Sequence, residues 1–163
     1  MVLEINNIKD KTPHLLSFKY EATLSESLNL TDRNATFDIN GKVSKEGNIY
    51  ICELTANTLL SATCDLCLEH TPFPLEFTFS ESFSRESDEN TDIIHLENNT
   101  INLVDVLMAG LYVSLPPQFI CSDTCEGLCK DCGTNLNKQT CNCHEKEKET
   151  DPRFDALKNI QWR

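Results

Sequence analysis

The feature that most constrains the fold is a run of alternating apolar and polar residues at positions 72–83, PFPLEFTFSESF. Successive side chains of a strand point to opposite faces, so every second residue shares a face. The shared face of this run holds Phe73, Leu75, Phe77, Phe79 and Phe83. The run therefore predicts a strand with one face packed on a core.

Three earlier segments alternate in the same way: LLSFKYEATL (15–24), ATFDINGKV (35–43) and NIYICELTANTLLSATC (48–64). Glu46-Gly47-Asn48 has the composition of a hairpin turn between two of them. IIHL (93–96) adds one short strand. Successive strands with short connections indicate an antiparallel sheet that is packed on one face and wet on the other. We expect an α+β fold in which this sheet, or a partly closed barrel, forms the core.

A single helix is predicted near residues 103–114, NLVDVLMAGLYVSLPP. Asn102 is the expected N-cap and Pro116-Pro117 ends the run. The predicted apolar stripe would pack on the sheet and consists of Leu103, Val106, Leu107 and Leu111. Gly110 lowers helix propensity, so we expect it to mark a close approach between the helix and a neighbour.

Residues 121–143, CSDTCEGLCKDCGTNLNKQTCNC, contain six of the nine cysteines. A C-x2-C pair followed by glycine, as in CKDCG, can turn both sulfurs toward one ion, and thiolates suit Zn²⁺. We therefore predict a structural zinc site in this stretch. The segment has few apolar residues, so its order is expected to depend on the metal.

The ligand set stays open at this level because zinc takes four ligands and the stretch offers six. Cys129 and Cys132 are the surest, completed by Cys141 with Cys143 or by Cys121 with Cys125. A cluster of two metals and six thiolates is the third alternative. A second C-x2-C pair, Cys64 and Cys67, is interpreted as a buried structural thiol pair, with redox chemistry or a second metal as alternatives.

The formal net charge of −12, from 14 basic and 26 acidic side chains, argues against a broad nucleic-acid-binding surface and favours basic partners. The sequence shows no export signal and no apolar run long enough to span a membrane, so we expect a cytoplasmic protein without membrane contact. In that compartment thiols stay reduced, which favours metal binding over disulfides. We recognise no catalytic motif and expect no enzyme.

The chain is expected to divide into a sheet domain (1–117) and a cysteine-rich zinc-binding module (118–163) that ends in a short helix, DPRFDALKNI. Pro152 at the first helical position supports that helix. Its surroundings form the one basic stretch in which we predict a minor RNA or partner contact, through Arg153, Lys158, Trp162 and Arg163.

The order of these motifs resembles the bacterial YceD family, named for large ribosomal RNA subunit accumulation. The resemblance rests on CDLCLE, LYVSLPP, GLCKDCGTNLN and DPRFDALK, and covers roughly residues 45–160. It implies a non-enzymatic role in large-subunit ribosomal RNA processing and ribosome assembly. Given the acidic charge, we expect contact with the large-subunit precursor through a basic ribosomal or processing protein. The alternative function is a thiol–disulfide redox protein or redox sensor.

Overall fold

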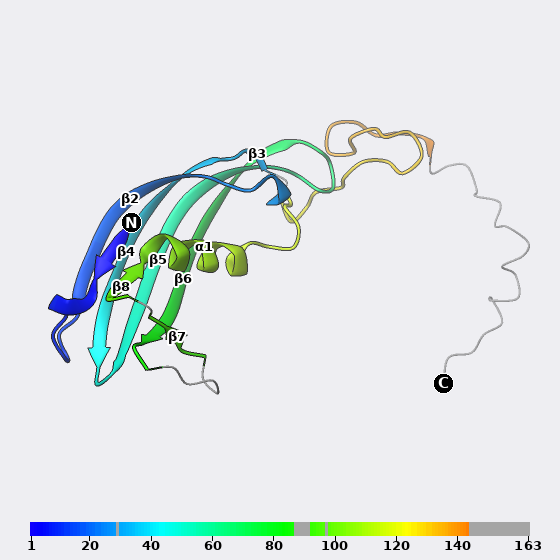
Figure 1. Cartoon of the computed structure of the whole chain (residues 1–163). Coiled ribbons are helices and arrows are strands. Elements are labelled where there is room, and N and C mark those ends of the chain that lie inside the picture. Colours follow the sequence, from blue (N-terminus) through cyan, green and yellow to red (C-terminus); the bar gives the residue numbers. More distant parts are fainter. Residues whose placement is uncertain (29, 87–91, 97, 144–163) are drawn as a thin grey trace, which may run out of the picture.

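The computed structural model describes residues 1–28, 30–86, 92–96 and 98–143 (Figure 1). Its strands are β1 (Val2–Glu4), β2 (His14–Thr23), β3 (Leu30–Asp32), β4 (Asn34–Glu46), β5 (Ile49–Thr63), β6 (His70–Ser84), β7 (Ile94–His95) and β8 (Thr100–Asn102). Its helices are the 3-10 helices η1 (Ile5–Asn7) and η2 (Glu26–Leu28) and the α-helix α1 (Leu103–Ser114). The predicted α-helix and the four predicted long strands are all present. The helix predicted from Asp151 onward lies outside the described residues.

The main sheet has the strand order β2-β4-β5-β6-β7, with β3 pairing the far end of β5. Neighbours from β2 to β6 are antiparallel, as expected for successive strands with short connections, whereas β7 adds in parallel to the end of β6. The β4–β5 hairpin closes at Glu46 and Ile49 around Gly47, which has φ +63°. Within the described residues the first and last strands of this order do not pair. Of the two predicted architectures, the structure is therefore the open sheet and not the partly closed barrel.

The sheet curves, and α1 lies in its hollow (Figure 1). The face toward α1 carries the alternating buried residues, among them Phe37, Ile39, Leu54 and Leu60, and receives the predicted helix stripe. Gly110 faces β6 so closely that an added Cβ would lie 2.6 Å from the Cβ of Phe79. The predicted close approach at this glycine is thus confirmed. Asn102 caps α1, because its Oδ1 accepts a hydrogen bond of 3.2 Å from the Val104 N–H.

The start of the chain closes the core beside α1. β1 pairs antiparallel with β8, which leads directly into the helix. Ile5 and Ile101 are then almost fully buried. Nothing in the sequence pattern singled out this two-stranded sheet, since each strand has three residues. No helix in the described ranges has the length and apolarity needed to cross a lipid bilayer.

The cysteine-rich segment begins at the end of the sheet where β5 turns into β6 (Figure 1). Phe119 packs its ring edge-on against Phe73 of β6, with ring centroids 5.2 Å apart. Its N–H donates to a carboxylate oxygen of Asp65 at 2.7 Å, and its carbonyl accepts from the Asp65 N–H at 2.8 Å. These contacts join the segment to the β5–β6 loop, across the boundary predicted near residue 117.

Candidate metal centre

Eight of the nine cysteines gather into two groups of four, and within each group all four sulfurs lie within 4.8 Å of one another. We call Cys64, Cys67, Cys121 and Cys125 the hairpin site, and Cys129, Cys132, Cys141 and Cys143 the segment site. All nine cysteines lie in described residues and none forms a disulfide. Each group could hold a metal ion.

Both groups start from a C-x2-C turn with the same backbone conformation. In the hairpin site the Leu68 N–H donates to the Cys64 carbonyl at 2.9 Å. In the segment site the Gly133 N–H donates to the Cys129 carbonyl at the same distance. The residue after the second cysteine is left-handed in each, with φ +61° at Leu68 and +72° at Gly133. Thus the glycine that marked CKDCG as a metal turn has a leucine as its counterpart in CDLCLE.

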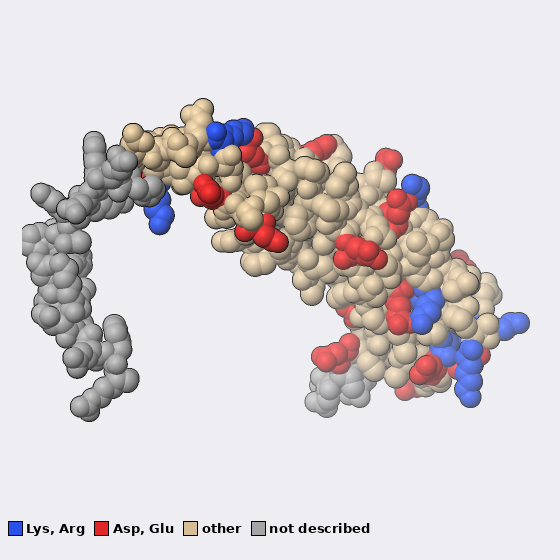
Figure 2. Space-filling view, turned by 180° about the vertical axis from the view of Figure 1, so that it is seen from behind, with Lys and Arg blue, Asp and Glu red and all other residues tan. Residues whose placement is uncertain are grey.

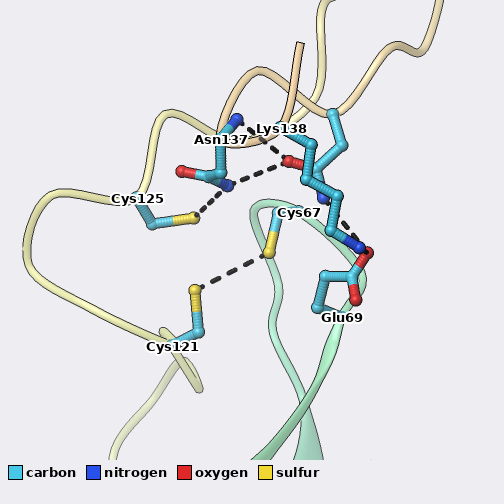
Figure 3. A network of polar contacts seen from close by, with 7 residues as sticks. Cys67, Glu69, Cys121, Cys125, Asn137 and Lys138 are labelled. Carbon is cyan, nitrogen blue, oxygen red and sulfur yellow. Dashed lines mark hydrogen bonds and ion pairs between the residues drawn. The ribbon is translucent and has the colours of Figure 1, made fainter.

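The sulfur separations in the hairpin site fit one tetrahedral ion. The Sγ atoms of Cys67 and Cys121 are 3.7 Å apart (Figure 3). Those of Cys64 and Cys125 are 3.9 Å apart. A tetrahedral ion with Zn–S bonds of about 2.3 Å spaces its four sulfurs about 3.8 Å apart. A disulfide needs sulfurs about 2.05 Å apart. These separations therefore fit four thiolates around one metal ion, and they are too long for disulfides between these pairs.

Hydrogen-bond donors surround the sulfurs of the hairpin site. The Cys121 N–H donates to the Cys64 sulfur at 3.4 Å, and the Asn137 side-chain amide donates to the Cys125 sulfur at 3.4 Å. Burial raises the pKa of Cys64, but N–H donors from Cys67, Cys121 and Leu66 outweigh it and lower that pKa to about 6. Such donors stabilise the thiolate form, which is the form that binds metal.

A hydrogen-bond donor also lies beside a sulfur of the segment site. The Thr134 hydroxyl lies 3.1 Å from the Cys132 sulfur, and hydrogen bonds from Thr134 lower the pKa of Cys132 to about 6. Hydrogen bonding to Cys132 and burial instead raise the pKa of Cys143 to about 12. Thiolates this close repel one another, so a divalent cation is what would let all four ionise together.

A polar network ties the loop of the segment site to the β5–β6 loop (Figure 3). Glu69 accepts from the Lys138 ammonium at 2.6 Å and from the Asn135 amide at 3.2 Å. Hydrogen bonding to Lys138 lowers the pKa of Glu69. The Leu128 N–H also donates to the Leu66 carbonyl at 3.0 Å. The two cysteine groups thus belong to one connected structure.

Cys52 stands apart from both groups. It lies near the start of β5, is fully buried, and pairs across the sheet with Val43 and Glu81. Burial, with the charges of Glu53 and Glu81, raises its pKa to about 12. Cys52 is therefore a core thiol and contributes no metal ligand.

The structure divides the six cysteines of residues 121–143 between the two groups. Cys141 and Cys143 lie with Cys129 and Cys132, whereas Cys121 and Cys125 lie with Cys64 and Cys67. Sequence reasoning kept Cys64 and Cys67 apart as a thiol pair and so missed their partners. Two features of the sequence could have revealed these partners. The C-x2-C motif occurs twice, and the eight cysteines other than Cys52 are enough for two groups of four. Arg153, Lys158, Trp162 and Arg163 lie outside the described residues.

The family model described as large ribosomal RNA subunit accumulation protein YceD matches residues 52–161. This range includes both cysteine groups. The chain is 50% identical over 42 residues to the chloroplastic large ribosomal RNA subunit accumulation protein YCED homolog 1 of Arabidopsis thaliana. That match covers 26% of this chain and 12% of the plant protein.

Uncharacterized proteins of Mycobacterium tuberculosis and Mycobacterium bovis are each 25% identical to this chain over 134 residues. The match covers 77% of this chain and 62% of each mycobacterial protein, so the chain spans less than two thirds of the length of these relatives. No solved structure matches the chain significantly.

Proposed function

The chain belongs to the YceD family, and on that premise we propose that it promotes the accumulation of large-subunit ribosomal RNA and the assembly of the large ribosomal subunit. The observation that carries the proposal is the family match over residues 52–161. The family name describes the level of an RNA and not a reaction, which supports a non-enzymatic role. The gathering of sulfurs in fours favours metal binding over the two-thiol exchange of a redox protein.

We propose that the protein acts mainly by contacting a basic ribosomal or processing protein in the precursor of the large subunit. The net charge of −12 supports this, because an acidic surface repels phosphate backbones and attracts basic proteins. Figure 2 shows acidic side chains along the length of one face of the molecule, with basic side chains mainly toward its ends. Direct RNA contact would be minor and would use Arg153, Lys158, Trp162 and Arg163.

We further propose that the segment site holds one structural zinc ion through Cys129, Cys132, Cys141 and Cys143. Four cysteines without histidine or carboxylate are typical of closed structural sites, whereas catalytic zinc keeps an open position. A zinc ion with four thiolates carries a charge of about −2, so it adds to the acidity of the protein. The ion would shape the segment rather than perform a reaction.

The experiment that tests the ribosomal role is affinity capture of the tagged full chain from native lysate, with and without ribonuclease. We expect large-subunit ribosomal or processing proteins to be recovered even after ribonuclease treatment. In cells that lack the chain, large-subunit ribosomal RNA should fall relative to small-subunit RNA and recover with the wild-type gene. Unchanged RNA levels in the deletion strain would contradict the proposed function.

The balance between protein and RNA contact is tested with two charge-matched double variants. Arg153→Gln/Lys158→Gln alters the proposed contact, and Lys9→Gln/Lys11→Gln changes the charge equally at two exposed residues elsewhere. Both variants should retain the protein partners. If recovery of all partners disappears with ribonuclease and with the first variant alone, the contact runs through RNA and the basic C-terminal stretch.

A further inference from the structure

The hairpin site contains ligands from two parts of the chain that are far apart in sequence. The two sulfur pairs at 3.7 and 3.9 Å join residues 54 and 61 positions apart, whereas the segment site needs only residues 129–143. Cys64 is fully buried and Cys67 nearly so, with 3% of its surface exposed. Two buried thiols beside two others need either hydrogen-bond partners or a cation.

We propose that the hairpin site binds its own zinc ion through Cys64, Cys67, Cys121 and Cys125, and that this second ion fastens the cysteine-rich segment to the end of the sheet. Four sulfurs at tetrahedral spacing, with N–H donors directed at two of them, carry this assignment. Each of the two ions is held by four unshared thiolates. The proposal concerns metal chemistry alone and stands independently of the ribosomal role.

The backbone around the hairpin site holds the first two cysteines in position for metal binding. The Cys64 N–H donates to the Glu69 carbonyl at 2.9 Å, closing the loop that carries the first two ligands. The loop repeats the turn of the segment site even though leucine must adopt the left-handed conformation at position 68. A bulky residue in that region is an outlier that the surrounding structure has to hold in place. A metal bound by both cysteines of the turn would do so.

Asn137 links the two sites and acts as a positioning residue. It lies in the loop between the two cysteine pairs of the segment site, and its amide donates to the Cys125 sulfur of the hairpin site at 3.4 Å. Its side-chain oxygen accepts from the Glu126 N–H at 2.9 Å. Partners of this kind orient a ligand and reduce the rate at which the metal leaves.

The number and separation of the ions are tested on the full chain purified with zinc. Elemental analysis should give two zinc ions per chain in the wild type, and one each in Cys64→Ser/Cys67→Ser and in Cys132→Ser/Cys143→Ser. In ¹¹³Cd-substituted wild type, NMR should show two four-thiolate resonances without cadmium–cadmium coupling. A single zinc ion per chain, coupled resonances from shared thiolates, or iron in place of zinc would overturn the assignment. The NMR measurement uses the wild type, so it still tests the number of ions if a double variant fails to fold.

The fastening role is tested by hydrogen exchange. In Cys64→Ser/Cys67→Ser the amides of Asp65 and Phe119 should exchange at least tenfold faster, whereas in Cys132→Ser/Cys143→Ser they should stay protected. Asn137→Ala keeps all eight ligands, so it should still bind two zinc ions but release one several-fold faster to a chelator. Asn40→Ala, at an exposed position on β4, is the matched control. Retained protection of Phe119 in the first variant would overturn the fastening role.

Discussion

Leu68 occupies the position that glycine holds in the other cysteine turn, and a left-handed backbone is costly for it. The left-handed region costs an L-residue with a Cβ roughly 1–2 kcal/mol, and glycine avoids that cost. Leu68 is 61% exposed, so burial of its side chain contributes little free energy to offset that backbone cost. We infer that the sulfur positions constrain this residue through Cys67, the ligand that precedes it.

Substitutions at Leu68 should therefore separate backbone strain from side-chain packing. Leu68→Gly is expected to bind zinc as tightly as the wild type or slightly more tightly. Leu68→Val should bind at least several-fold more weakly, because a β-branched residue fits the left-handed region worst. Zinc competition with a chelator of known affinity measures both effects. Weaker binding by the glycine variant than by the valine variant would contradict this account.

Gly110 offers a second prediction, in which packing opposes helix propensity. Gly110→Ala gains about 1 kcal/mol of helix propensity. The new Cβ would lie 2.6 Å from Cβ and 2.9 Å from Cγ of Phe79, so helix and sheet must move apart. We expect the variant to lose roughly 1–3 kcal/mol of unfolding free energy, as overpacked cores do. Urea unfolding of the metal-loaded protein measures it, with the exposed Val113→Ala as the control. If Gly110→Ala were more stable than the wild type, the contact between α1 and Phe79 would be able to adjust to the added methyl group.

At the scale of elements, β5 joins the core to the candidate metal centre. Its inward-facing residues run from Tyr50 through Cys52 to Ala62, and it ends directly before Cys64. The hydrogen-bonded pairing with β6 continues to Thr63 and His70, so the loop that carries Cys64 and Cys67 starts from a rigid base. The same strand thus holds a buried core thiol and ends beside Cys64, the first cysteine of the hairpin site. These two cysteines differ in their surroundings, because Cys52 lies among core side chains and Cys64 lies beside three other cysteines.

The buried thiol of Cys52 should make stability depend on alkaline pH. Its pKa is raised to about 12 in the folded protein, so above the ordinary value of 9 the unfolded chain loses this proton first. Loss of a proton by the unfolded state favours unfolding as pH rises, so the stabilisation is complete below pH 9 and disappears toward pH 12. Urea unfolding of the wild type and Cys52→Ala should show a steeper fall between pH 9 and 11 in the wild type. Parallel curves would contradict a raised pKa.

At the scale of the whole molecule, the two cysteine groups connect parts that the sequence pattern treats as separate domains. The hairpin site takes two cysteines from each side of the predicted boundary at residue 117. Phe119, Glu69 and Lys138 add packing and polar contacts across the same boundary. Because the Glu69–Lys138 ion pair is half exposed, it should contribute less than the metal. Metal removal is therefore expected to loosen the segment while the sheet stays folded.

Thiol labelling in the metal-loaded and chelated states tests this expectation directly. In the zinc-loaded protein all nine thiols should react slowly, eight because they bind metal and Cys52 because it is buried. After chelation eight should react rapidly, and Cys52 should react only on unfolding in denaturant. Mass spectrometry of the labelled chain identifies each site. Rapid labelling of Cys52 after chelation would mean that the sheet also depends on the metal.

The features that depend on neighbours along the chain could be predicted from the sequence. Alternation set the long strands and their buried faces, Asn102 and Pro116-Pro117 bounded α1, and each C-x2-C turn brought two sulfurs together. How those sulfur pairs combine depends on contacts between parts of the chain that are far apart in sequence. The segment docks on the β5–β6 loop, which places Cys121 and Cys125 beside Cys64 and Cys67, more than 50 positions away. Spacing fixes which cysteines share a turn, but the packing of distant elements fixes which turns come together.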